Sequence, residues 1–207
     1  MLNDKEDDMN MWDERYSGEE YHFGTEPSGF LIANCDLLKP GMHCLALADG
    51  EGRNGVWLAE QGLHVHSVDS SSVAIDKARK LAARKNVRLE LELADLSDWD
   101  FGLEKYDVVV AVFIQFAPPA LREKMFEKIR NCLKLGGLLL LHGYTPRQLE
   151  YRTGGPSQLE NLYTESMLKE AFSDMEIISL HEYDQEIREG SGHSGMSALI
   201  DLVAKKV

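Results

Sequence analysis

The most informative segment of this chain is Cys44-Leu-Ala-Leu-Ala-Asp-Gly-Glu-Gly-Arg-Asn-Gly55. Its first five residues, Cys44–Ala48, form a short apolar run, which is typical of a strand buried on both faces. The glycine-rich residues that follow predict a turn, and Val56-Trp-Leu-Ala59 then opens a helix. Such a loop exposes backbone N–H groups at the positive end of the helix, and glycine lets a ligand approach that backbone closely. The segment therefore predicts a ligand-binding loop.

A carboxylate follows the next strand of the predicted fold. His64–Val68 is a second apolar run, and it ends at Asp69. Gly50–Gly55 has the spacing G-x-G-x-x-G, which is weak evidence alone, but a carboxylate after the second strand is placed to accept hydrogen bonds from ribose hydroxyls. The loop and the acid together favour a nucleotide-like ligand. The alternative is that Asp69 only begins a helix with Ser70-Ser-Ser72, which supplies N-cap candidates.

Strands and helices alternate along the rest of the chain, which predicts a parallel sheet covered by helices on both faces. A helix is expected from Pro118-Pro119 to Gly136-Gly137. Two final strands, joined by a glycine-rich segment, are typical of an antiparallel pair. We therefore expect one α/β domain over 1–207: a Rossmann-like, doubly wound, mostly parallel seven-stranded sheet with an antiparallel C-terminal strand pair. The other predicted strands are Val87–Leu93, Val108–Ile114, Leu138–Leu141, Glu176–Tyr183 and Met196–Ala204.

The composition argues against several classes of protein. The 207 residues are 43% hydrophobic and 28% charged, as in ordinary globular proteins. With 22 Lys and Arg against 35 Asp and Glu, the net charge of −13 disfavours nucleic acid and anionic membrane surfaces as partners. Three scattered cysteines argue against a disulfide framework or a zinc site, and no metal is expected. The sequence shows no secretory leader or membrane span, and we expect a cytoplasmic protein.

Two classes of cofactor fit the loop and Asp69, namely a nicotinamide dinucleotide and S-adenosylmethionine. Three features favour the second. Ala94-Asp95-Leu96 follows the third strand, where a carboxylate can reach an adenine amino group. Leu133-Lys-Leu-Gly-Gly137 leads directly into the fifth strand. The chain then ends in the antiparallel pair rather than in a second mononucleotide-binding half.

Six motifs carry a family resemblance that covers the chain from about Trp12 to its end. They are Trp12-Asp-Glu-Arg-Tyr16, Tyr21-His-Phe-Gly-Thr-Glu-Pro27, Gly50-Glu-Gly-Arg-Asn54, Pro118-Pro-Ala-Leu-Arg122, Leu135-Gly-Gly137 and Tyr144-Thr-Pro-Arg-Gln-Leu149. In this order they resemble the class I S-adenosylmethionine-dependent methyltransferases. More narrowly, they resemble the branch of tellurite-resistance methyltransferases and thiopurine methyltransferase-like proteins. The resemblance is specific for the fold and the cofactor, and not for the methyl acceptor.

The resemblance also implies roles for individual residues. Residues 1–40 would form a helical N-terminal flap over the cofactor, and residues 41–207 the Rossmann-like core. The flap would contribute Tyr16, Tyr21, Phe23 and Gly24. The methionine part of the cofactor would lie along Asp49, Gly50 and Gly52, the ribose at Asp69 and Ser70, the adenine at Asp95 and Leu96, and the sulfonium beside Val112 and Phe113.

The chain departs from the family pattern at two positions. It has Ala46 where the family often has an acidic residue, and Ala48 where glycine is frequent. The missing carboxylate would help to hold the ammonium group of the cofactor, and Asp49 is expected to replace it. The methyl group of Ala48 is expected to narrow the turn.

The acceptor side shows no catalytic triad or metal cluster. Methyl transfer from a sulfonium needs neither, because the protein mainly positions and desolvates two reactants. Arg147 and Arg152, in the loop after the fifth strand, suit an anionic acceptor, with exposed surface charges as the alternative. The catalytic candidates, each with a purely structural alternative, are Gln115, His142, Tyr144 and His193.

The sequence thus predicts S-adenosylmethionine-dependent methyl transfer to a small molecule that is anionic or a soft nucleophile, such as a thiol, selenite or tellurite. Two alternatives stay open: a nicotinamide-dependent oxidoreductase, and a non-catalytic module that binds S-adenosylmethionine. No nucleic-acid or membrane partner is expected, and the sequence leaves the oligomeric state open.

Overall fold

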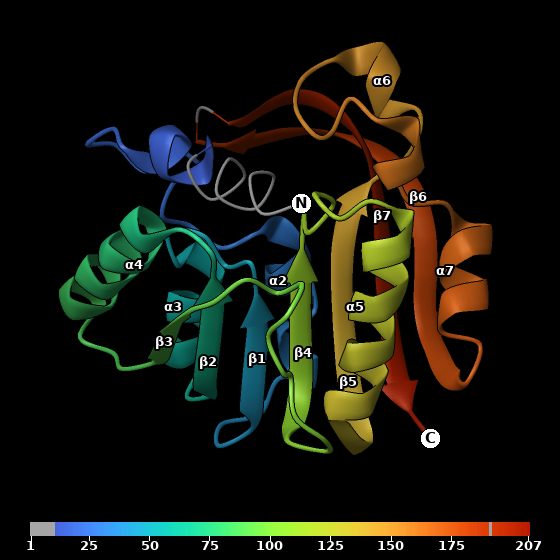
Figure 1. Cartoon of the computed structure of the whole chain (residues 1–207), viewed down its shortest axis with the longest axis horizontal. Coiled ribbons are helices and arrows are strands. Elements are labelled where there is room, and N and C mark those ends of the chain that lie inside the picture. The colour runs from blue at the N-terminus through green and yellow to red at the C-terminus, as the bar shows by residue number, and fades with distance from the viewer. Residues whose placement is uncertain (1–10, 191) are drawn as a thin grey trace.

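A computed structural model of the chain describes residues 11–190 and 192–207. Its centre is a seven-stranded sheet in the order β3-β2-β1-β4-β5-β7-β6, with helices on both faces (Figure 1). Strands β1 to β5 are parallel, and β7 runs antiparallel to both β5 and β6, which confirms the predicted α/β sheet. The strands are β1 His43–Leu47, β2 His64–Asp69, β3 Glu90–Leu93, β4 Tyr106–Val112, β5 Leu133–Tyr144, β6 Met175–Glu189 and β7 His193–Lys206.

Helices connect the parallel strands, as crossovers of this kind require. Residues 11–16 are also helical and precede the sheet. No helix of the described ranges is both long and apolar enough to cross a membrane. The α-helices are α2 Gly29–Ala33, α3 Arg53–Glu60, α4 Ser72–Lys85, α5 Pro119–Cys132, α6 Gln148–Tyr151 and α7 Glu165–Ala171, and the 3-10 helices are η1 Cys35–Leu37 and η2 Leu159–Asn161.

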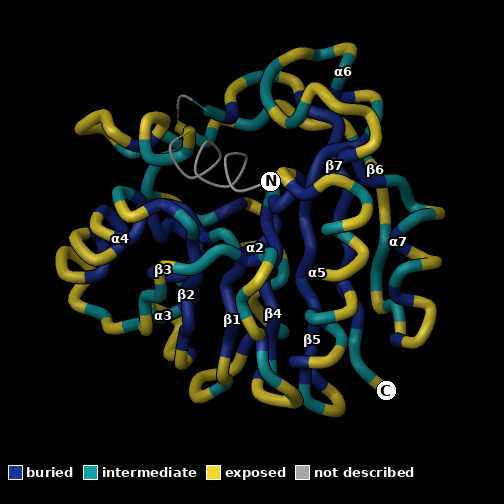
Figure 2. Tube along the Cα trace, in the orientation of Figure 1, coloured by how far each residue is buried: buried dark blue, intermediate teal, exposed yellow. Residues whose placement is uncertain are grey.

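The central strands fill one apolar core on each face of the sheet, and their dark trace in Figure 2 shows that they are buried. Leu45 and Leu47 of β1 pack in the core that includes side chains of α5 and α7. Cys44 and Ala46 of the same strand pack in the core that includes α2 and α3. Burial on both faces explains why these strands are continuous apolar runs in the sequence.

Two hydroxyl caps and a proline mark the starts of three helices. The Ser71 hydroxyl accepts a hydrogen bond from the Ala74 N–H (3.1 Å) at the start of α4. The Thr164 hydroxyl does the same for the Met167 N–H (3.3 Å) at the start of α7. Pro119 occupies the first turn of α5, where its missing N–H costs least.

Two boundaries differ from the prediction. Helix α5 ends at Cys132, and Gly136-Gly137 lies within β5 rather than closing the helix. The glycines instead accompany a shift in register between β4 and β5, and Gly136 has a φ of +79°. The third strand is shorter than Val87–Leu93, because only Glu90–Leu93 pairs with β2.

The largest difference concerns the C-terminal pair. Strand β6 continues to Glu189, and β7 already begins at His193. Most of the expected glycine-rich connection is therefore paired strand. The far end of this hairpin crosses above the carboxyl ends of the parallel strands and reaches the N-terminal residues (Figure 1). Close backbone approach requires glycine there: a Cβ on Gly190 would lie 2.3 Å from the carbonyl oxygen of His22. The Gly192 N–H donates to that same carbonyl (3.0 Å).

Ala48 gives a first testable consequence, because its φ of 45° lies in the left-handed region that favours glycine. Ala48→Gly is expected to raise the free energy of unfolding by up to about 1 kcal/mol. The left-handed penalty of ~1–2 kcal/mol that it removes exceeds the ~0.5–1 kcal/mol that glycine costs in backbone entropy. Urea unfolding measures the change. Ala46→Gly, within β1, is the control and should only destabilise; a loss of stability at both positions would contradict the argument.

Candidate cofactor and active site

The loop after β1 turns over the carboxyl ends of the strands, a region we call the carboxyl rim (the loops that follow β1, β2, β4 and β5). Gly50 and Gly52 have φ values of +60° and +86°. The Gly50 N–H donates to Asp69 Oδ2 (2.8 Å), which ties the loop to the end of β2. The Tyr16 ring covers the loop so closely that a Cβ on Gly50 would lie 2.9 Å from its hydroxyl oxygen. Glycine is needed here for the backbone turn and for this approach.

Asp69 accepts backbone hydrogen bonds from Gly50 (2.8 Å), Ser71 (2.9 Å) and the half-buried Ser70. The side chain is buried, and this burial raises its pKa to about 6, against the hydrogen bonds, which lower it. A carboxylate offers about four lone-pair sites. Asp69 therefore keeps capacity to accept a hydrogen bond from a ligand hydroxyl.

Asp49 points into the fold at the start of α3. Its two oxygens accept from the Gly55 N–H (3.1 and 3.2 Å), and Oδ2 also accepts from the Ser67 hydroxyl (2.9 Å). Burial raises its pKa to about 7. Asp49 thus supplies the side-chain cap that Gly52 cannot give to α3. Its predicted role toward the cofactor's ammonium group stays a prediction.

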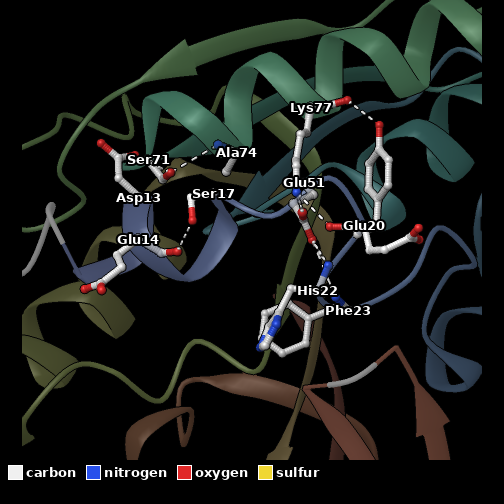
Figure 3. A network of polar contacts seen from close by, with 11 residues as sticks. Asp13, Glu14, Ser17, Glu20, His22, Phe23, Glu51, Ser71, Ala74 and Lys77 are labelled. Carbon is white, nitrogen blue, oxygen red and sulfur yellow. Dashed lines mark hydrogen bonds and ion pairs between the residues drawn. The ribbon is translucent and has the colours of Figure 1, made fainter.

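Glu51 fastens the N-terminal segment (residues 11–28) to the glycine-rich loop (Figure 3). Glu51 Oε2 accepts from the His22 N–H (2.7 Å). Lys77 Nζ donates to Glu51 Oε1 (2.7 Å) and to the Glu20 carbonyl (2.8 Å). Glu51 is 3% exposed and Lys77 8% exposed, so this is a buried ion pair that holds two segments distant in sequence.

Further contacts hold the same segment over α4. Asp13 Oδ1 accepts from the Ser71 hydroxyl (2.6 Å) (Figure 3). The same oxygen accepts from the Val73 N–H (3.3 Å). The Tyr21 hydroxyl donates to the Lys77 carbonyl (3.0 Å). Gly24 has a φ of +73° and lies against Gly190 of the hairpin. Residues 1–10 of the predicted flap lie outside the described residues.

The residues expected near the adenine lie after β3. Asp95 Oδ1 accepts from the Ser97 N–H (2.8 Å), and Asp95 is half-buried. Leu96 is buried in the core on the α5 face. Val112, the last residue of β4, is buried in the core on the other face. These positions stay predictions as cofactor contacts.

Aromatic rings converge on Phe113, directly after β4. The Phe113 ring centroid lies 4.3 Å from that of His193, and 4.6 Å from those of Tyr144 and His142. Phe23 of the N-terminal segment lies 4.4 Å from His193. Phe113 has a φ of 56°, and strained backbone of this kind is concentrated at functional sites. We call these five residues the aromatic cluster, and it brings together three of the four catalytic candidates.

Arg53, the first residue of α3, reaches the end of the hairpin. Its Nη2 donates to Glu189 Oε2 (2.8 Å), and the same oxygen lies 3.6 Å from His193 Nδ1. Burial raises the pKa of Glu189, but contact with His193 and the Arg53 guanidinium outweigh it and hold the pKa at about 2. Burial lowers the pKa of His193. Glu189 is therefore ionised at neutral pH, while burial disfavours the charged form of His193.

Two of the catalytic candidates, Gln115 and His142, have structural partners. Gln115 is buried, and its Nε2 donates to the carbonyls of Tyr144 (2.9 Å) and Asn161 (3.1 Å). Its Oε1 accepts from the Tyr144 N–H (2.6 Å), so Gln115 fixes the end of β5. His142 Nδ1 lies 2.6 Å from Asp201 Oδ1, which is directly opposite on β7.

Arg147 and Arg152 are exposed. Arg147 pairs with Asp184 of β6 (2.5 Å) and lies over the Tyr151 ring. Arg152 follows α6 with a φ of 55°. Their predicted contact with an acceptor stays a prediction.

A group of potential metal ligands lies on β2 and β3. Single ligand atoms of His66, Glu90 and Glu92 lie within 4.8 Å of one another. His66 Nδ1 lies 2.9 Å from the Tyr106 hydroxyl, and its Nε2 lies 2.8 Å from Glu92 Oε2. These contacts account for the group without a cation.

Four residues that act at or beside the rim were not predicted from the sequence: Glu51, Arg53, Lys77 and Glu189. Glu51 and Arg53 lie inside the glycine-rich loop, and their position was the available signal. Lys77 lies in a helix and Glu189 in an expected connection, and nothing local marks either of them. Each finds its partner only when the chain folds.

Comparison with known proteins settles the family. Residues 44–137 match the family described as "Methyltransferase domain". The chain is 30% identical over 167 residues to the carboxy-S-adenosyl-L-methionine synthase of Helicobacter hepaticus, covering 70% of this chain and 69% of the relative. The chain belongs to the class I S-adenosylmethionine-dependent methyltransferases. It spans 43%, 51% and 47% of three other curated relatives.

Solved structures share the fold of this chain. TehB of Haemophilus influenzae has a TM-score of 0.71 at 20% identity, covering 96% of this chain and 67% of that one. The magnesium protoporphyrin IX methyltransferase of Synechocystis PCC 6803, solved with bound S-adenosylhomocysteine, has a TM-score of 0.64 at 17% identity, covering 96% and 83%. At these identities the likeness concerns the fold alone.

S-adenosylmethionine is the cofactor of this methyltransferase, and the residues of the rim fit it. The glycine-rich loop offers backbone N–H groups at the start of α3, and Asp69 has spare acceptor capacity for hydroxyls. The faces of Phe23 and Phe113 suit a sulfonium cation.

Asp69 gives a second testable consequence. Because its pKa is about 6, it is protonated below that pH and loses its charge as a hydrogen-bond acceptor. We expect S-adenosylhomocysteine to bind more weakly as the pH falls from about 7.5 to about 5. Asp69→Asn should weaken binding by ~1.5–3 kcal/mol at neutral pH and show a flatter pH dependence. Calorimetry measures both; equal affinity of variant and wild type would contradict the assignment.

Proposed function

We propose that this methyltransferase acts on a small molecule that is anionic or a soft nucleophile, as in the tellurite-resistance and thiopurine methyltransferase-like branch. One observation carries the proposal: the N-terminal segment and the hairpin close over the carboxyl rim. The Gly192 N–H donates to the His22 carbonyl (3.0 Å), and the Phe23 and His193 rings are 4.4 Å apart. A rim closed in this way suits a small acceptor better than a macromolecule.

The residues of the rim mainly position the cofactor and the acceptor. When bound, S-adenosylmethionine supplies a methyl group that is already activated on a sulfonium sulfur. The glycine-rich loop and Asp69 hold the cofactor, while Phe23 and Phe113 exclude water and favour the cation. A thiolate or an oxyanion needs no base, which agrees with a rim where Gln115 and His142 have structural partners.

An acceptor screen tests the proposal. Release of S-adenosylhomocysteine is measured with thiols, selenite, tellurite and small carboxylates, and at least one should be turned over. A protein that binds the cofactor and releases no product with any acceptor would instead be the non-catalytic module. Stabilisation by NAD and not by S-adenosylmethionine would support an oxidoreductase.

The predicted flap has its own test. We expect hydrogen exchange in residues 11–25 to slow when S-adenosylhomocysteine binds, because Tyr16 and Phe23 then pack on a ligand. The exchange of the last turn of α5, which leads into the opposite end of β5, is the internal control. Unchanged exchange in residues 11–25 would mean that this segment is only structural.

A further inference from the structure

Three buried polar atoms at the carboxyl rim have no hydrogen-bond partner among the residues that the structure describes. They are Arg53 Nη1, Tyr144 Oη and His193 Nδ1. Buried donors and acceptors in native proteins are nearly always paired, because an unpaired group loses its hydrogen bond to water on burial. Three such atoms in one place point to a ligand that pairs with them.

Printed contacts bring the three side chains together. Glu189 Oε2 accepts from Arg53 Nη2 (2.8 Å) and lies 3.6 Å from His193 Nδ1. The rings of Tyr144 and His193 are 5.7 Å apart. A Cβ on Gly154 would lie 3.3 Å from the Tyr144 hydroxyl and 3.5 Å from His193 Cδ2. The three side chains therefore meet around Glu189, between the glycine-rich loop and the hairpin.

The charges around the three atoms indicate which chemical group of a ligand binds there. Glu189 uses one edge of the Arg53 guanidinium and fixes its orientation, which leaves Nη1 as a rigid donor. Glu189 also balances the charge of Arg53, which disfavours a dianion. The free Arg53 edge and the Tyr144 hydroxyl are donors, so they require a group with several lone pairs. A carboxylate has these properties, and it pairs well with an arginine edge and a hydroxyl.

The side chains around these three atoms indicate what the rest of the ligand is like. The Phe113 ring lies 4.3 Å from His193 and 4.6 Å from Tyr144, and Phe23 closes the other side of His193 at 4.4 Å. Rings at these separations are in contact with one another, and they make the surroundings of the three polar atoms aromatic and apolar.

We propose that Arg53, Tyr144 and His193 bind a carboxylate of the methyl acceptor, whose planar apolar body packs on the aromatic cluster. This inference rests on the proposed function and names its substrate class. It transfers the predicted anion contact from the exposed Arg147 and Arg152 to a buried arginine. The three side chains bind and orient the acceptor.

Benzoate and benzamide are the probes, titrated by calorimetry into the protein saturated with S-adenosylhomocysteine. Benzoate should bind more tightly than benzamide, which has the same ring without the charge. Arg53→Lys keeps a cation for Glu189 but removes the free guanidinium edge. It should weaken benzoate binding about tenfold or more while the affinity for S-adenosylhomocysteine stays within about threefold.

Tyr144→Phe is the second variant, and Tyr163→Phe is its matched control. Both remove a buried hydroxyl that has no partner among the described residues, and the Tyr163 ring packs instead in the core near Phe126. Both variants should therefore fold at least as stably as the wild type, but only Tyr144→Phe should weaken benzoate binding.

Two outcomes would overturn the inference. The first is benzoate binding that is absent, equals that of benzamide, or is insensitive to Arg53→Lys and Tyr144→Phe. The second is a loss of S-adenosylhomocysteine affinity in Arg53→Lys, which would assign the arginine to the cofactor's own carboxylate. Both are binding results, so they are independent of the acceptor screen, whose failure would concern methyl transfer itself.

Discussion

Replacing Lys77 by methionine is expected to lower the free energy of unfolding by about 3–5 kcal/mol, the cost of breaking a buried ion pair. Lys77 Nζ lies 2.7 Å from Glu51 Oε1, and the two side chains are 11% and 2% exposed. Methionine fills a similar volume but leaves the Glu51 carboxylate buried without its cation. The Glu20 carbonyl loses its hydrogen bond as well.

Denaturant unfolding measures this loss, and Lys169→Met is the matched control. Lys169 lies at the same 2.7 Å from a glutamate oxygen, but its side chain is 56% exposed. Exposed pairs contribute less than about 1 kcal/mol. Equal losses in Lys77→Met and Lys169→Met would contradict a buried, energetically important pair.

The double variant Glu51→Gln/Lys77→Met separates stability from attachment of the N-terminal segment. With no charge left unpaired, it should recover part of the unfolding free energy. The introduced glutamine keeps an amide oxygen that can still accept from the His22 N–H, which in the wild type donates to Glu51 at 2.7 Å. Hydrogen exchange of residues 20–24 should therefore be slower in the double variant than in Lys77→Met alone.

The parts of the fold that were predictable are those coded by local patterns. The buried strands are apolar runs, and Ser71, Pro119 and Thr164 act at helix starts through neighbours only a few residues away. The glycine-rich loop and Asp69 were identified because their position after successive parallel strands brings them to one rim. In each case the physical cause lies within one supersecondary unit.

The missed features depend on contacts between distant parts of the chain. Glycines around Gly190 are typical of a flexible connection, but here they allow a paired hairpin to pass within contact of His22. Arg53 gains a role only when Glu189 arrives at the end of that hairpin. Arg147 and Arg152 lie on the expected side of the sheet. The sequence could not show that these two arginines would be exposed while Arg53 would be buried.

Gly52→Ala is expected to destabilise the protein by about 1–4.5 kcal/mol. This combines a left-handed backbone penalty of ~1–2 kcal/mol with ~1–3 kcal/mol of overpacking, less the ~0.5–1 kcal/mol of backbone entropy that alanine saves. Gly52 has a φ of +86°, and its Cβ would lie 2.6 Å from Ala78 Cβ and 3.0 Å from Ala78 Cα. The second contact is with the backbone of α4, which cannot rotate away. Relief requires α3 and α4 to separate, and that moves the loop that holds the cofactor.

Gly41→Ala isolates the backbone contribution. Gly41 has the same φ of +86°, but a Cβ there would meet nothing within 4 Å. It should cost only the ~1–2 kcal/mol of left-handed strain, less the ~0.5–1 kcal/mol of backbone entropy that alanine saves, and leave S-adenosylhomocysteine affinity unchanged. The difference between the two variants in urea unfolding is then the cost of the contact with Ala78.

Adding Ala78→Gly to Gly52→Ala tests the contact directly. Removing the Ala78 methyl eliminates the 2.6 Å contact, although the 3.0 Å contact with its Cα stays. The single variant Ala78→Gly should itself destabilise α4 by ~1 kcal/mol, because glycine is a poor helix former. Additive losses would mean that Gly52 is required only for its backbone conformation. If the double variant instead loses less stability than the sum of the two single losses, the packing between α3 and α4 positions the cofactor loop.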